Sequence, residues 1–146
     1  MFCALMTSSL ASFSQTIFLT TNGRVDVNGG LRYWRDTTAT VQYETLKDGV
    51  FGPCNSENSP NIGFDRSAHW FKIAVTNQSQ SSEWLMEIAY APLDQIDFYV
   101  GESDGTITHK TTGDHFPIAQ RDLAHRHPIF AFSLLPGEST NIYIRV

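Results

Sequence analysis

Hydrophobic and polar side chains alternate one by one along two neighbouring segments in the middle of the chain, residues 69–77 and 84–90. The apolar positions that share one face are Phe71, Ile73 and Val75 in the first segment and Trp84, Met86, Ile88 and Tyr90 in the second. A period of two residues is that of a β-strand, because a helix repeats every three to four residues. The polar stretch 77–82 between them favours a turn, so the sequence predicts two consecutive strands that can pair antiparallel.

Shorter versions of the same pattern recur along the chain, separated by turn residues such as Asn-Gly, Asp-Gly and Pro-Gly. The further predicted strands are residues 17–19, 31–36, 95–100, 106–110, 129–135 and 141–146. Residues 40–46 lack the alternation and are predicted to form a short helix with Thr40 as its N-cap, with an edge strand as the alternative. About eight short strands at regular spacing predict an all-β fold, an antiparallel β-sandwich of two sheets.

The chain has 146 residues, a length that fits one domain with one hydrophobic core. Residues 1–14 are apolar or small, carry no charge and end in Ser-Phe-Ser, a pattern that a signal peptidase can cleave before Gln15. We interpret them as a signal-peptide-like leader, with an ordinary N-terminal extension as the alternative. Residues 15–146 are the predicted β-sandwich domain. Because its last strand reaches Val146 without a polar tail, we expect this domain to be truncated at its C-terminus.

The charge balance argues against a nucleic-acid partner. The sequence holds 10 basic and 15 acidic residues, a net charge of −5, and no run of Lys or Arg. Binding to nucleic acid requires clustered basic side chains that neutralise phosphates, so no such binding is expected. Cys3 lies in the leader and Cys54 in a Gly-Pro-Cys-Asn loop. Nothing in the sequence around Cys54 marks it as a nucleophile.

Motifs of catalysis are missing from the sequence, which has no Gly-x-Ser-x-Gly, no His-Glu-x-x-His and no glycine-rich phosphate loop. We therefore predict a protein that is not an enzyme and uses no cofactor. The pair His125-x-His127, with Asp114 and His115 upstream, offers residue types that bind zinc when three or four of them converge. Because both histidines precede Pro128 in a predicted loop, we expect solvated side chains and no metal site.

Aromatic side chains are the first candidates for binding a ligand. Trp70 and Tyr99 face away from the apolar positions of their strands and are expected on the outer side. Together with Trp84 they could form a concave aromatic surface on which sugar rings pack. The alternative is that the tryptophans fill the sandwich core or cover its second face.

Two arginines are the second candidates. Arg121 and Arg126, with His125 beside them, flank one predicted loop and could clamp an anionic ligand through their planar guanidinium groups. The alternative is a structural role, in which the arginines pair with nearby acidic side chains. Those acidic side chains are Asp114, Asp122 and Glu102.

The order and spacing of several short motifs, from about Tyr33 to Val146, resemble a known family. The matching pieces are Phe51, Asn61-Ile62-Gly63, Trp70-Phe71-Lys72, Val75-Thr76-Asn77, Trp84-Leu85-Met86-Glu87-Ile88, Ile96-Asp97-Phe98-Tyr99, Asp104-Gly105, Thr112-Gly113-Asp114, Arg121, His125-Arg126, residues 130–134, Pro136-Gly137 and residues 142–146. The family is the type 2 extracellular domain of bacterial seven-transmembrane receptors with diverse intracellular signalling modules. Lys72 departs from the family, which usually carries Arg there.

This resemblance implies a jelly-roll sandwich similar in shape to carbohydrate-binding modules, located on the periplasmic face of the inner membrane. It implies a seven-helix membrane region downstream in the full-length protein, followed by a cytoplasmic module such as a diguanylate cyclase or a histidine kinase. The family has no common ligand, so the resemblance assigns no binding residue.

The function predicted from these observations is ligand sensing without catalysis, with a small molecule such as a carbohydrate as the ligand. One alternative is a carbohydrate-binding module or a fragment of a secreted glycan-active enzyme. Another is a structural domain through which the receptor forms a homodimer without any ligand. The coding sequence after Val146 separates the first alternative from the receptor, because a membrane region needs runs of about 20 apolar residues.

Overall fold

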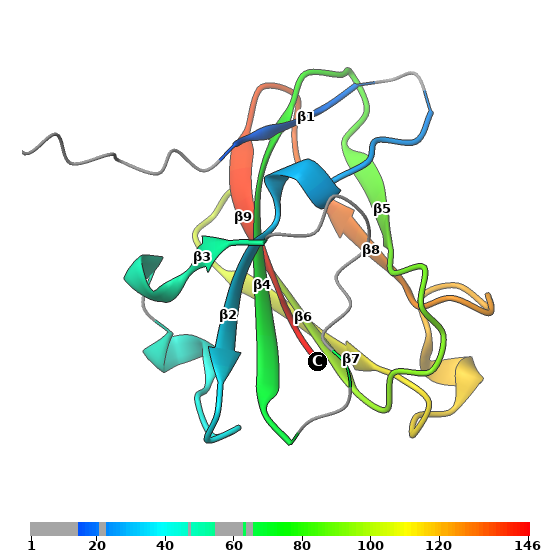
Figure 1. Ribbon diagram of the computed structural model, residues 1–146. Helices are drawn as coiled ribbons and strands as arrows, with labels where there is room; N and C mark the ends of the chain where they lie inside the picture. Colours follow the sequence, from blue (N-terminus) through cyan, green and yellow to red (C-terminus); the bar gives the residue numbers. More distant parts are fainter. Residues whose placement is uncertain (1–14, 21–22, 47, 55–62, 64–65) are drawn as a thin grey trace, which may run out of the picture.

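The computed structural model describes residues 15–20, 23–46, 48–54, 63 and 66–146, which form nine β-strands, four short 3-10 helices and no α-helix (Figure 1). The strands are β1 Ile17–Leu19, β2 Arg32–Asp36, β3 Gly52–Pro53, β4 Ala68–Asn77, β5 Glu83–Glu87, β6 Ile96–Gly101, β7 Ile107–Thr112, β8 Ile129–Ser133 and β9 Ser139–Arg145. The 3-10 helices are η1 Asn28–Gly30, η2 Tyr43–Thr45, η3 Asp48–Val50 and η4 Ile118–Gln120. The predicted all-β class is confirmed. The predicted leader, residues 1–14, lies outside the described residues.

The strands form a large sheet and a small one (Figure 1). The large sheet has the order β3-β2-β4-β9-β6-β7, and β1 adds to the end of β4 in parallel. The small sheet contains β5 and β8. Every pairing other than that of β1 with β4 is antiparallel. This arrangement is sandwich-like, as predicted, whereas the jelly-roll winding stays a prediction.

The predicted pairing of residues 69–77 with residues 84–90 is wrong. β4 pairs with β2, β1 and β9, while β5 pairs with β8 in the other sheet. Both strands turn their apolar face to the same core, where Phe71 of β4 and Met86 of β5 belong to one cluster. They therefore face each other across the interior, and the link 78–82 crosses from one sheet to the other.

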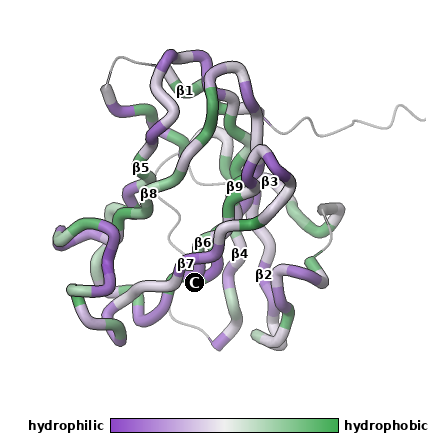
Figure 2. The backbone as a smooth tube through the Cα atoms, turned by 180° about the vertical axis from the view of Figure 1, so that it is seen from behind, coloured by the Kyte–Doolittle hydropathy of each residue, from purple (hydrophilic) through white to green (hydrophobic). Residues whose placement is uncertain are grey.

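The main core lies between the two sheets. Its buried members are Ile17, Leu19, Phe71, Ile73, Val75, Met86, Ile96, Phe98, Val100, Phe130, Phe132, Leu134, Ile142 and Ile144. Phe98 of β6 stacks on Phe130 of β8, with ring centroids 4.7 Å apart, so the two sheets touch directly at this point. Figure 2, which shows the molecule from behind, has hydrophobic stretches along β8 and β9. The alternation of apolar residues along the strands predicted this face correctly.

The opposite face of the large sheet is covered as well. Trp70, Tyr99 and Tyr143 form a second buried cluster there with Phe51, and Tyr43 of η2 packs against it. Residues 40–46, predicted as a short helix, contain a single 3-10 turn at Tyr43–Thr45, whose N-cap is Gln42 instead of Thr40. Tyr99 was expected on an open outer surface, which is wrong because this irregular segment lies over it.

A buried asparagine fixes the crossing between the sheets. Asn77, at the end of β4, is fully buried. Its Nδ2 donates hydrogen bonds of 2.7 Å to the carbonyl oxygens of Ser81 and Leu134. Its Oδ1 accepts hydrogen bonds of 2.9 Å from the backbone N–H and the hydroxyl of Ser79. One side chain therefore holds the link to β5 and the end of β8 against β4.

We predict that Asn77→Ala destabilises the domain by roughly 2–4 kcal/mol, because several buried groups lose their hydrogen-bond partner. Asn77→Asp should be at least as harmful, since a carboxylate oxygen would face two carbonyl oxygens. Chemical denaturation followed by tryptophan fluorescence measures both effects. Gln78→Ala, which alters an exposed neighbour, should stay within about 0.5 kcal/mol of the parent chain. Equal losses at both positions would contradict the assigned role of Asn77.

Candidate functional site

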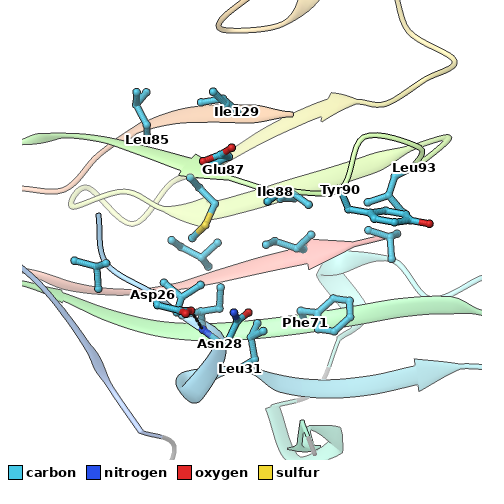
Figure 3. A pocket seen from close by; sticks show the side chains of 18 of the residues that line it. Asp26, Asn28, Leu31, Phe71, Leu85, Glu87, Ile88, Tyr90, Leu93 and Ile129 are labelled. Carbon is cyan, nitrogen blue, oxygen red and sulfur yellow. Dashed lines mark hydrogen bonds between the residues drawn. The ribbon is translucent and has the colours of Figure 1, made fainter. Parts of the chain in front are cut away.

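A cavity of about 1290 Å³ lies between the two sheets and is the candidate ligand site. Its walls come from β4 and β9 of the large sheet, from β5 and β8 of the small sheet, and from the segments 23–31 and 88–95. Figure 3 shows Leu85 and Glu87 on one side of it and Phe71 and Leu31 on the other. The cavity exists because a sheet of two strands covers only part of the larger sheet.

The inner walls of the cavity are apolar and its outer part is polar. The apolar walls include Phe71, Ile73, Val75, Met86, Ile88, Ile142 and Ile144. Side chains of both charges stand around the outer part: Arg24, Asp26, Glu87 and Asp94. Asp26 Oδ1 accepts a hydrogen bond of 2.9 Å from the backbone N–H of Asn28, which shapes the start of η1 (Figure 3). Such a lining suits a small molecule with an apolar body and polar groups at one end.

Two buried polar groups belong to residues that line the cavity. His69 is buried, and its Nδ1 lies 2.9 Å from the hydroxyl of Tyr33 in a hydrogen bond. The Nε1 of Trp84 is buried and has no hydrogen-bond partner among the described residues. Because buried donors are normally paired, an acceptor on a bound ligand would satisfy this indole group.

At the edge of the cavity, Glu87 contacts two basic side chains through its two oxygens. His127 Nδ1 lies 2.7 Å from Glu87 Oε1, and Arg24 Nη2 lies 3.5 Å from Glu87 Oε2. The hydrogen bond from His127 lowers the pKa of the Glu87 carboxyl, and its partial burial opposes this effect without cancelling it. Glu87 is therefore ionised at neutral pH. Nothing in the sequence pointed to this contact, since its partners lie 40 residues apart.

The predicted aromatic surface of Trp70 and Tyr99 is closed. Trp70 has no exposed surface, and Tyr99 is buried between Tyr43 and His109, whose ring centroids lie 4.6 and 4.2 Å away. Burial, together with the charge of Asp97, raises the pKa of the Tyr99 phenol to about 12. Both residues belong to the outer cluster and neither lines the cavity. Their assignment as ligand contacts gains no support from this geometry and stays a prediction.

Arg121, His125 and Arg126 lie together in the loop before β8. Arg121 Nη1 donates a hydrogen bond of 2.8 Å to the carbonyl oxygen of His125, and its Nη2 lies 3.5 Å from the carbonyl oxygen of Gly113. Arg121 therefore braces two loop segments through their backbone, and the expected acidic partner Asp122 pairs with Lys110 instead. His125 and Arg126 are exposed. Binding of an anion by these three residues stays a prediction.

A carboxylate beside the outer cluster, Asp97, is only 5% exposed. It accepts hydrogen bonds from Gln95, Thr111 and His109 at 2.9, 2.7 and 3.1 Å. Arg145 Nη1 lies 3.5 Å from its second oxygen. Burial raises the pKa of the Asp97 carboxyl, and these hydrogen bonds, led by that from Thr111, outweigh burial, so the net pKa lies below its ordinary value.

We predict that Asp97 makes stability depend on pH under acidic conditions. Because its folded-state pKa is lowered, the stabilisation is complete above the unfolded value of about 3.9 and is lost as the pH falls through the folded value. Asp97→Asn should lower the free energy of unfolding at pH 7 and flatten its decline below about pH 4. Thr111→Val should act in the same direction but less. Urea titrations at several pH values measure this, and an unchanged slope in Asp97→Asn would contradict the prediction.

Comparison with known proteins adds one finding. The family model described as 7TMR-DISM extracellular 2 matches residues 28–146, which include every strand except β1. The comparison with curated proteins gave no match.

Proposed function

The chain belongs to the 7TMR-DISM extracellular 2 family, and from this premise we propose that it senses a small molecule that binds in the cavity between its two sheets. The family comprises the extracellular sensor domains of seven-transmembrane receptors, so the domain belongs on the periplasmic side of a membrane. In the full-length receptor, we propose, a seven-helix membrane region and a cytoplasmic diguanylate cyclase or histidine kinase follow it. Among the described residues, no helix has the length and apolar character needed to cross a membrane.

The cavity is the observation that carries this proposal. It is large enough for a drug-sized molecule, because such sites range from about 300 to 1,000 Å³. A carbohydrate can place the face of a ring on Phe71 or Tyr90, the latter 54% exposed, and direct its hydroxyls to the polar edge. The aliphatic walls fit a less polar molecule equally well, for example one whose carboxylate reaches Arg24.

Signalling then requires that the ligand binds one arrangement of the receptor more tightly than another. The ligand contacts both sheets, so closing them around it would change their relative position. The domain needs no bond-making step for this role. The rival functions are a carbohydrate-binding module of a secreted enzyme and a domain that only mediates formation of a receptor homodimer.

We predict that the coding sequence after Val146 contains several runs of about 20 apolar residues, as a membrane region requires. Sequencing this region tests the receptor part of the proposal directly. A stop codon, or a glycan-active catalytic domain in place of these runs, would support the secreted rival and contradict the receptor.

We predict that at least one compound class in a panel of sugars, carboxylates and small apolar molecules raises the melting temperature of the chain. Ile88→Trp, which places an indole in the cavity, should weaken the affinity for that compound at least tenfold by calorimetry. Leu135→Trp is the matched control, because Leu135 is 50% exposed and lies outside the cavity. If no compound stabilises the chain, or if both variants bind alike, the cavity is not the sensing site.

A further inference from the structure

Glu87, at the edge of the cavity, lies close to His125 and His127 of the loop before β8, and these three residue types are ones that bind zinc. The nitrogen and oxygen atoms of Glu87, His125 and His127 that can bind a metal all lie within 4.8 Å of one another. We propose that they form a binding site for a divalent transition-metal ion, with Zn²⁺ as the ion that fits best. The expectation that these histidines are only solvated loop residues did not include Glu87, which the fold brings to them.

The backbone fixes the positions of the three ligands. Glu87 closes β5 and pairs with Ile129 of β8, and the N–H of Ile88 donates to the carbonyl oxygen of Pro128. This pairing sets residue 127 beside Glu87. The His125 ring lies against the His127 ring, with centroids 5.4 Å apart, and Arg121 holds the carbonyl of His125. The site is therefore built by a ladder of strands and a braced loop before any metal binds.

The distances are close to those that zinc requires. Zinc bonds of ~2.0–2.1 Å in a tetrahedron separate neighbouring ligand atoms by about 3.3 Å. His127 Nδ1 and Glu87 Oε1 are 2.7 Å apart, so they would move slightly apart to bind one metal ion, and any proton between them would be released to solvent. His125 Nδ1 accepts a hydrogen bond of 3.1 Å from the backbone N–H of His127. Because His125 is exposed, its ring can turn to present a nitrogen to the metal.

The charges and the ligand types favour Zn²⁺ over Ca²⁺ or Mg²⁺. Two imidazoles and one carboxylate form the donor set of many zinc sites, whereas Ca²⁺ and Mg²⁺ prefer oxygen ligands alone. The Glu87 carboxylate supplies the negative charge of the donor set. Arg24 contacts the other oxygen of Glu87 with a side chain that is 76% exposed, so solvent screens its repulsion. The fourth position remains open to water.

Isothermal titration of the full chain with ZnCl₂ tests the site. Cys3→Ser and Cys54→Ser in the parent chain remove thiolates that would also bind zinc. We expect one ion per chain, and an affinity at least about tenfold weaker in each of His125→Ala, His127→Ala and Glu87→Gln. Co²⁺ in place of Zn²⁺ should give the visible absorption of a tetrahedral site in the parent and lose it in the variants.

His115→Ala is the matched control, because His115 Nε2 also faces a carboxylate, Asp94, at 3.6 Å, but no third metal-binding side chain joins them among the residues that the structure describes. This variant should bind zinc like the parent. Since His125 is exposed, His125→Ala is not expected to disturb the fold, which circular dichroism checks. Parent-like binding in His125→Ala, absence of binding in the parent, or an equal loss in His115→Ala would overturn the proposal. The compound panel for the cavity is measured with a chelator, so the two results are independent.

Discussion

The burial of β4 on both faces is the constraint from which the rest of the structure follows. A strand presents alternate side chains to opposite sides, so one strand can serve two clusters. Phe71, Ile73 and Val75 enter the core between the sheets, while Trp70 enters the aromatic cluster outside. β9 pairs with β4 over seven residues and repeats this division, with Ile142 and Ile144 inside and Tyr143 outside. The two central strands therefore hold both layers together.

Each face of the large sheet is covered by a different part of the chain, one irregular and one made of strands. The outer cover is an irregular segment that carries Tyr43 and Phe51. Its path starts at Asp36, a buried carboxylate that accepts hydrogen bonds from the N–H groups of Thr38 and Val41. The inner cover is the pair of β5 and β8, which seals β6 through the stack of Phe98 on Phe130. Because this cover has only two strands, it does not pack against the whole inner face of the large sheet, and the cavity lies beside β4.

Period-two alternation encodes the face of each residue, and the structure agrees with it for Phe71, Met86, Phe98 and Ile142. Alternation does not encode the partner of a strand. Residues 69–77 and 84–90 follow each other, so pairing was expected, but two strands with matching apolar faces can equally oppose each other across a core. Trp70 and Tyr99 do lie on the predicted side of the sheet, but their burial depends on a covering segment that shows no period. The contact of Glu87 with His127 depends on the register between β5 and β8, two strands that lie far apart in the sequence. No local sequence motif predicts such a contact.

Glu87 is the residue through which the edge of the cavity and the loop before β8 influence each other. It lines the cavity, pairs with Arg24 on one side and bonds to His127 on the other. Its charge is held by these partners, so any change in the partner of either oxygen alters the electrostatic potential where a polar group of a ligand would lie. A ligand that attracts Arg24 away from Glu87 would strengthen the interaction of Glu87 with His127. By thermodynamic linkage, a stronger contact between Glu87 and His127 would in turn favour binding of that ligand. The two sheets touch directly at β6 through Phe98 and Phe130, so the charge of Glu87 acts on the side of the sandwich where the sheets enclose the cavity.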